Sequence, residues 1–128
     1  MYSSPLQAYE TVNKATMSGR EIEAAVLNRA ALKLKECQNN WNADDRDERL
    51  EAALNFNQQI WTIFQGELVK ADNPLPKQIR QNLLALGAYI DKRIFEIMAF
   101  PSPEKLDIVI DINRNIAAGL IQAASAEH

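Results

Sequence analysis

The sequence predicts an all-α protein, a compact single-domain bundle of about five helices, with one short N-terminal helix and four longer ones. Three observations favour this fold. Apolar residues recur at spacings of three and four, proline and capping residues divide the chain into segments of helical length, and alternating β-strand patterns are nearly absent. The 128 residues suit one domain, spanning residues 1–128, with room for a core.

The first two predicted helices each begin at a capping box. The segment Ser4-Pro5-Leu6-Gln7 combines a serine cap with a proline at the first helical position, so we expect a short helix over about residues 5–14. The segment Ser18-Gly19-Arg20-Glu21 repeats the capping pattern and opens a helix rich in alanine and leucine. This second helix should reach about Gln38, because Asn39-Asn40 ends the apolar pattern.

The third predicted helix begins at an acidic turn. Carboxylates cluster from Asp44 to Glu51, where the positive end of a helix dipole stabilises negative charge. We therefore expect a helix from about Asp45 to about Ala71. A cation or partner site is the alternative for this cluster, but exposed carboxylates are usual in a first turn and favour the helix start.

Prolines define the last two predicted helices. Pro76 is placed to begin a mostly buried helix that runs to about Ala99. Ser102 is the expected N-cap, and Pro103 the first residue, of a final helix to about Ala124. Apolar residues cover so much of this last helix that it either lies centrally or leaves a surface for another helix.

Two asparagines interrupt apolar stripes on the third and fifth predicted helices. Asn57 and Asn113 each occupy a position that the helical rhythm assigns to an apolar residue; the other members of the two stripes are Leu50, Leu54, Trp61, Phe64 and Leu68, and Leu106, Ile110, Ala117 and Leu120. An amide on such a seam costs stability unless its donors and acceptors are paired. We therefore predict that Asn57 and Asn113 form internal hydrogen bonds that fix how the helices dock.

Residues that could carry chemistry have simpler structural interpretations. His128 is the only histidine and ends the sequence, and Cys37 is the only cysteine, so it is expected to be a small semi-buried apolar residue. Gly66 and Gly87 lie within predicted helices and are expected to allow close helix approach, because a mid-helix glycine costs about 1 kcal/mol relative to alanine. We predict no catalytic residue, no cofactor site and no metal site.

Charge and hydropathy exclude several classes of protein. The formal net charge is −3 and neither half is strongly basic, which argues against DNA or RNA binding. No run approaches the roughly 18 apolar residues of a membrane-spanning helix. A single cysteine allows no intramolecular disulfide and fits a reducing compartment, so we expect a cytoplasmic protein without membrane insertion.

Five segments follow one another in a specific order and spacing: Asn57 to Phe64, Asn73 to Pro76, Leu83 to Leu86, Lys92 to Phe95, and Leu106 to Leu120. In these segments the sequence resembles the FlaF family of bacterial flagellar biosynthesis regulators. The string Asn-Arg-Asn-Ile-Ala-Ala-Gly-Leu that ends the last segment is the most specific part of the resemblance.

The resemblance implies a helical cytoplasmic protein that is not an enzyme and is required for flagellin production and export. It implies action opposite a partner regulator, FlbT, which restrains translation of flagellin mRNA. Flagellin carries long amphipathic terminal segments whose apolar faces stay unpaired until the filament assembles. We expect the bundle to receive such a segment as a helix in a groove, with aromatic anchors and amides that set the register. The residues expected to bind the partner are Trp61, Phe64, Asn113, Arg114 and Asn115.

Two other functions remain open. The protein could act after transcription on flagellin mRNA together with FlbT, which the even charge makes less favourable. It could also be a structural subunit that forms a homo-oligomer through the apolar row Ile108, Ile112 and Ile116.

Overall fold

The computed structural model describes the backbone of residues 19–126 and the side chains of residues 19–122. Its α-helices are α2 (Gly19–Asn39), α3 (Arg46–Leu68), α4 (Lys77–Ala99) and α5 (Leu106–Ala126), and a short 3₁₀ helix, η1 (Pro103–Lys105), precedes α5. No strand occurs within these residues, so the all-helical prediction is confirmed for this part of the chain. The short helix expected over residues 5–14 lies outside the described residues.

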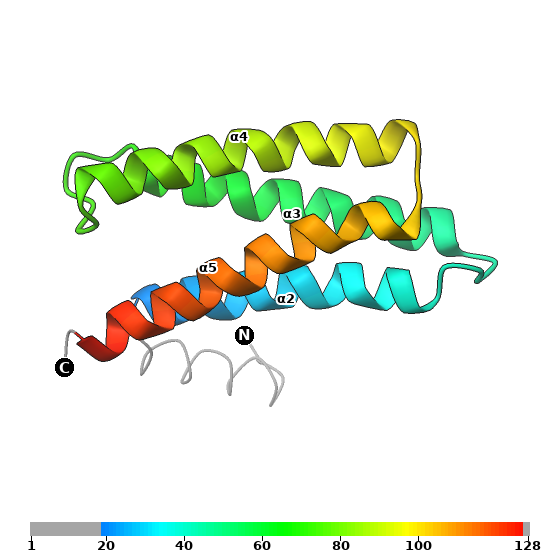
Figure 1. The fold of residues 1–128 in the computed structure, drawn as a ribbon, viewed down its shortest axis with the longest axis horizontal. Helices are drawn as coiled ribbons and strands as arrows, with labels where there is room; N and C mark the ends of the chain where they lie inside the picture. The colour runs from blue at the N-terminus through cyan, green and yellow to red at the C-terminus, as the bar shows by residue number, and fades with distance from the viewer. Residues whose placement is uncertain (1–18, 127–128) are drawn as a thin grey trace, which may run out of the picture.

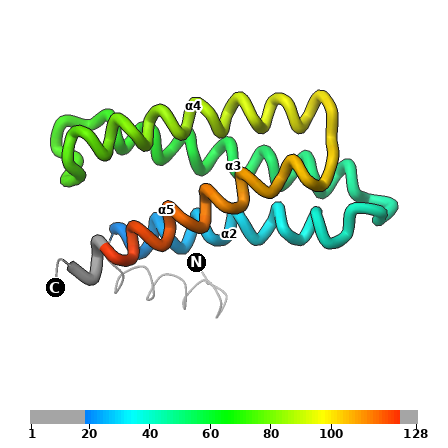
Figure 2. Tube along the Cα trace, in the orientation of Figure 1, coloured from blue at the N-terminus to red at the C-terminus, as the bar shows by residue number. Residues whose placement is uncertain are grey.

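The four α-helices run alternately in opposite directions and form an elongated bundle (Figure 1). α2 packs most extensively on α5 and also on α3, whereas α4 packs on α3 and makes few contacts with α5. The chain trace shows α4 and α5 separating with distance from the loop that joins them (Figure 2). α4 therefore joins the bundle mainly through α3.

Short side chains on α2 allow its close packing. Ala24, Ala30 and Ala31 are fully buried and are interspersed with the larger buried residues Leu27 and Leu34. Helix backbones approach closely where the side chains at the contact are small. α2 can therefore pack against α5 and α3 at once.

α3 ends at Leu68, before the end expected at Ala71, because Asn73 caps it. Asn73 Nδ2 donates to the backbone oxygen of Glu67 (3.0 Å), and Asn73 Oδ1 accepts the backbone N–H of Leu75 (3.0 Å). The amide thus adds a second partner to a carbonyl of the last helical turn, which also accepts the backbone N–H of Lys70 (3.3 Å). It also holds the corner that leads into α4.

The last helix begins with a 3₁₀ turn, whereas the sequence predicts an α-helix from Pro103. Ser102 makes no side-chain cap bond, and its backbone oxygen instead accepts the N–H of Lys105 (3.3 Å). Gln38 on α2 donates through Nε2 to the Pro103 oxygen (2.9 Å) and to Asp107 Oδ1 (2.6 Å). Such turns are frequent at helix starts, and Gln38 ties this one to α2.

Candidate functional site

A chain of hydrogen bonds between buried side chains joins α3, α5 and α2. The Trp61 indole Nε1 donates to Asn113 Oδ1 (2.8 Å), and Asn113 Nδ2 donates to Asn57 Oδ1 (2.6 Å). Asn57 Nδ2 donates in turn to the backbone oxygens of Ala53 (2.8 Å) and Ala30 (3.1 Å). Both asparagines are 0% exposed, so the amides predicted to hydrogen-bond internally do so. We call these contacts the amide network; they fix the relative positions of three helices.

Trp61 and Phe64 belong to the core. Trp61 is 0% exposed and Phe64 is 6% exposed, and their rings meet edge to face with centroids 5.7 Å apart. Aromatic pairs favour this geometry. A partner cannot reach Trp61 or Asn113 while the bundle is folded, so neither is the accessible anchor that the sequence predicts. In the folded protein both hold helices together.

An apolar groove lies between the first turns of α2 and the second half of α3. Ile22 and Val26 on α2 and Ile60 and Ile63 on α3 line it, and the nearly buried Phe64 forms part of its floor. Its volume is about 150 Å³, and Ile63 is 65% exposed. We call this hollow the α2–α3 groove. It is the place where one of the expected binding residues, Phe64, meets the surface.

The charged residues that line the α2–α3 groove are two glutamates, Glu23 and Glu67. Burial raises the pKa of Glu23 above its ordinary value; Arg20 opposes this shift, and the carboxylate of Glu67 adds to it. Glu67 itself forms an ion pair with Lys70, whose Nζ lies 2.9 Å from Glu67 Oε1. The described residues that line the groove include no lysine or arginine. The groove therefore combines an apolar floor with an acidic edge.

The remaining two expected binding residues lie elsewhere. Arg114 and Asn115 are exposed on α5, and neither lines the α2–α3 groove. The structure thus places Trp61, Asn113 and Phe64 in the core, with Phe64 at its edge. It leaves Arg114 and Asn115 on a separate surface. A role for these two in partner binding stays a prediction.

Sequence patterns do not single out most residues of the groove. Ile60 and Ile63 fall outside the seven-residue apolar pattern that contains Trp61, so the pattern does not assign them to the buried face of the helix. Ile22 and Val26 read as part of the buried face of α2, although both are only half-buried. One sequence feature could have indicated the groove. α3 carries two isoleucines three residues apart, beside an apolar stripe that is already complete, and such extra apolar residues favour an exposed apolar surface.

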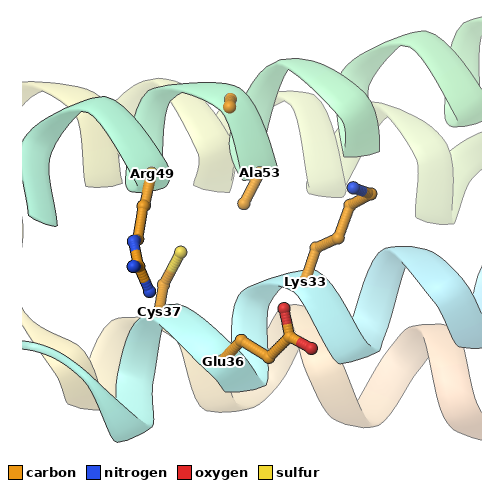
Figure 3. Close-up of a pocket in the computed structure, with 6 residues that line it drawn as sticks. Lys33, Glu36, Cys37, Arg49 and Ala53 are labelled. Atoms are coloured by element: carbon orange, nitrogen blue, oxygen red, sulfur yellow. The ribbon is translucent and has the colours of Figure 1, made fainter. Parts of the chain in front are cut away.

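Another hollow between α2 and α3, near the loop that joins them, contains the cysteine (Figure 3). Lys33, Glu36 and Cys37 reach it from α2, and Arg49 and Ala53 from α3, with the sulfur directed between the two helices. Burial raises the pKa of the Cys37 thiol, which disfavours the reactive thiolate. Cys37 is 4% exposed, more deeply buried than expected.

The isoleucine row of α5 is largely covered within the chain. Ile112 and Ile116 are half-buried and pack against the core, and Ile108 is 36% exposed. The described part of the protein therefore offers only a narrow remnant of this row to a second copy.

Residues 19–126 contain neither a cluster of metal-ligating side chains nor a helix suited to spanning a bilayer. No group of three or more histidine, cysteine, aspartate or glutamate side chains in this part of the chain is arranged to hold a metal ion. None of its helices combines the length and apolar character needed to cross a bilayer.

Comparison with known proteins identifies one family. The family described as "Flagellar protein FlaF" matches residues 5–120. No curated protein and no solved structure matches the chain. The matched range includes the α2–α3 groove and every residue of the amide network.

Proposed function

The chain belongs to the FlaF family of flagellar proteins, and on this premise we propose that it is a non-enzymatic regulator of flagellum biogenesis. It promotes flagellin synthesis and secretion by binding flagellin directly, as a cytoplasmic chaperone or export factor. FlbT, which restrains translation of flagellin mRNA, is its functional counterpart.

The observation that carries this proposal is the α2–α3 groove. Ile63 is 65% exposed, and it stands beside Ile22, Val26 and Ile60 in one apolar hollow. Apolar grooves between helices accept the apolar face of an amphipathic helix, with side chains about one turn apart as anchors. The terminal segments of flagellin have such a face and need a cover before the filament assembles.

The core behind the groove supports this function by holding its floor in place. Phe64 touches the edge of Trp61, and the Trp61 indole is fixed by its hydrogen bond to Asn113. A preformed floor lowers the ordering cost of binding. In this proposal Phe64 contacts the partner, whereas Trp61 and Asn113 hold the helices of the bundle together.

A titration of the full chain with flagellin, and with each flagellin terminal segment alone, tests the proposal. Replacing Ile63 by serine should weaken binding about tenfold, because it removes an exposed apolar wall of the groove. Ile121→Ser is the matched control, since Ile121 is also exposed, at 46%, but lies on α5 outside the groove. It should change the affinity by less than about twofold.

Two results would overturn the proposal. One is the absence of any flagellin binding at concentrations on the order of hundreds of micromolar. The other is equal weakening by Ile63→Ser and Ile121→Ser, which would place the contact away from the groove. RNA affinity that falls steeply with added salt, without flagellin binding, would instead favour control of flagellin mRNA translation together with FlbT.

A further inference from the structure

One flank of α4 carries large exposed apolar side chains near the C-terminal end of the helix. Phe95 is 75% exposed and Met98 is 42% exposed. They are three residues apart on one helix and therefore lie on the same face, one turn from each other. Because α4 packs on α3 and makes few contacts with α5, no helix of the described bundle covers this flank.

Beside this flank lies a groove between the start of α3 and the end of α4, which we call the α3–α4 groove. Leu50 and Leu54 on α3 form its apolar base, and Met98 and Pro101 form the opposite wall. Its volume is about 480 Å³, larger than the about 150 Å³ of the α2–α3 groove. Phe95 does not line the groove itself, but it lies one turn from Met98 on the same face of α4.

The charged residues that line the α3–α4 groove are both acidic. Asp47 and Glu51 line its α3 side, and the lining residues include no lysine or arginine. Glu51 forms no ion pair with any residue that the structure describes. Asp47 accepts from Arg46 Nε (2.7 Å), but it remains 83% exposed.

The two nearest arginines of α3 contact other residues of the chain, and one of them, Arg46, pairs with Asp47 at the edge of the groove. The Arg46 guanidinium lies 4.5 Å from the centre of the Trp41 ring, and Arg49 Nε donates to Asp45 Oδ2 (2.7 Å). Arg49 also reaches the cysteine hollow, on the α2 side of α3. Neither arginine lines the α3–α4 groove and neither pairs with Glu51, so the Glu51 carboxylate is available to an incoming cation.

We infer that the α3–α4 groove binds a basic amphipathic helix of a partner protein. Leu50, Leu54 and Met98 receive its apolar face together with the exposed Phe95 one turn along α4, and Glu51 pairs with a lysine or arginine beside that face. This site is separate from the α2–α3 groove and does not depend on flagellin being the ligand there.

The test uses the full chain and two synthetic peptides of about 18 residues, long enough for about five helical turns. Both carry leucines at helical spacing on one face, and their flanks carry either lysines or glutamates. The lysine peptide should bind at least about tenfold more tightly than the glutamate peptide, and the difference should shrink between about 0.05 and 0.5 M salt.

Three substitutions test whether the lysine peptide binds in the α3–α4 groove. Glu51→Lys should weaken the lysine peptide at least about fivefold, and Phe95→Ser should weaken it about tenfold. Asp72→Lys is the charge control: it makes the same charge change at an exposed residue in the α3–α4 corner, far along the chain from Glu51, and should leave binding within about twofold. Unfolding midpoints of all three variants, measured by circular dichroism, check that the fold persists.

Several results would overturn the inference. Equal binding of the two peptides would show that the carboxylates do not contribute to affinity. Equal effects of Glu51→Lys and Asp72→Lys would show that only the net charge of the chain matters, and not the position of Glu51. Unchanged binding by Phe95→Ser, or no binding at about 1 mM peptide, would exclude the groove. A dimer of the chain alone that Phe95→Ser dissociates would show that a second copy covers this face instead.

Discussion

Trp61 on α3 and Phe95 on α4 are both aromatic residues on helices with broad apolar faces, but their surroundings differ completely. Trp61 is 0% exposed and its indole donates to Asn113, whereas Phe95 is 75% exposed. α3 packs against α2 and α4 and is bonded to α5 through Trp61, whereas α4 packs mainly on α3. The number of helices around a position, more than its residue type, decides whether an aromatic side chain builds the core or remains available to a partner.

The largest expected effects separate these two aromatics by stability. Trp61→Ala should lower the free energy of unfolding by about 4 kcal/mol, because it leaves a cavity and an unpaired Asn113 oxygen. Phe95→Ala should change it by less than about 0.5 kcal/mol, as is usual for exposed positions. Urea denaturation followed by circular dichroism measures both values. Similar losses for the two variants would mean that α4 is buried more deeply than described.

The next comparison is between two asparagines of α5. Asn113→Ala should cost about 2 to 3 kcal/mol, because Trp61 Nε1 and Asn57 Oδ1 both lose their buried partner. Asn115→Ala, at an exposed position two residues away, should cost less than about 0.5 kcal/mol. In a double-mutant cycle, Asn57→Ala and Asn113→Ala should together cost less than the sum of the single changes. Additive costs would contradict a shared network.

Smaller changes in stability are expected at the glycines within α3 and α4, Gly66 and Gly87. A Cβ at Gly66 would meet nothing within 4 Å, so this glycine does not serve the close helix approach that the sequence predicts. Gly66→Ala should therefore stabilise the protein by about 0.5 to 1 kcal/mol through helix propensity alone. At Gly87 a Cβ would press on the Gln65 side-chain amide, and Gly87→Ala should gain less. Thermal midpoints of the two variants compare them, and a larger gain at Gly87 would refute this assignment.

The smallest effect concerns the acidic rim of the α2–α3 groove. Because the pKa of Glu23 is raised in the folded protein, the native state binds more protons than the unfolded state near and above the ordinary glutamate pKa. The stability contributed by Glu23 is thus present at low pH and lost as the pH rises through the folded-state pKa. Glu23→Gln should be more stable than the parent at pH 7, and the difference should vanish below about pH 4. Denaturation at the two pH values tests this, and a difference that grows toward acid pH would reverse the sign.

Much of the fold follows from local chemistry in the sequence. The start of α4 after Pro76 and the internal pairing of Asn57 and Asn113 are predictable, because proline geometry and an unpaired buried amide have large local costs. The end of α3 is not predictable from the same rules. Asn73 stops it through a bond to the backbone of Glu67, and that contact depends on the path of the corner.

The candidate site is harder to predict than the core. Trp61 and Phe64 stand out in the sequence as aromatic anchors, but Trp61 lies on the apolar seam of α3 and points inward once α2 and α4 pack on α3 and Asn113 of α5 bonds to it. Ile63 and Phe95 lie outside the seams and owe their exposure to where the neighbouring helices end or diverge. Helical spacing predicts on which face of its helix a residue lies, but it does not predict how many other helices pack against that face.

Flagellin affinity of Trp61→Phe and Ile63→Ser, measured side by side in conditions where both variants are fully folded, tests the central claim most directly. Phenylalanine keeps an aromatic ring in the core but cannot donate to Asn113, so we expect a loss of about 1 to 3 kcal/mol in stability with flagellin affinity within about twofold of the parent. Ile63→Ser should keep its stability and bind flagellin about tenfold more weakly. The reverse result, with binding lost at Trp61 and retained at Ile63, would contradict the assignment of the core to assembly and of the groove to binding.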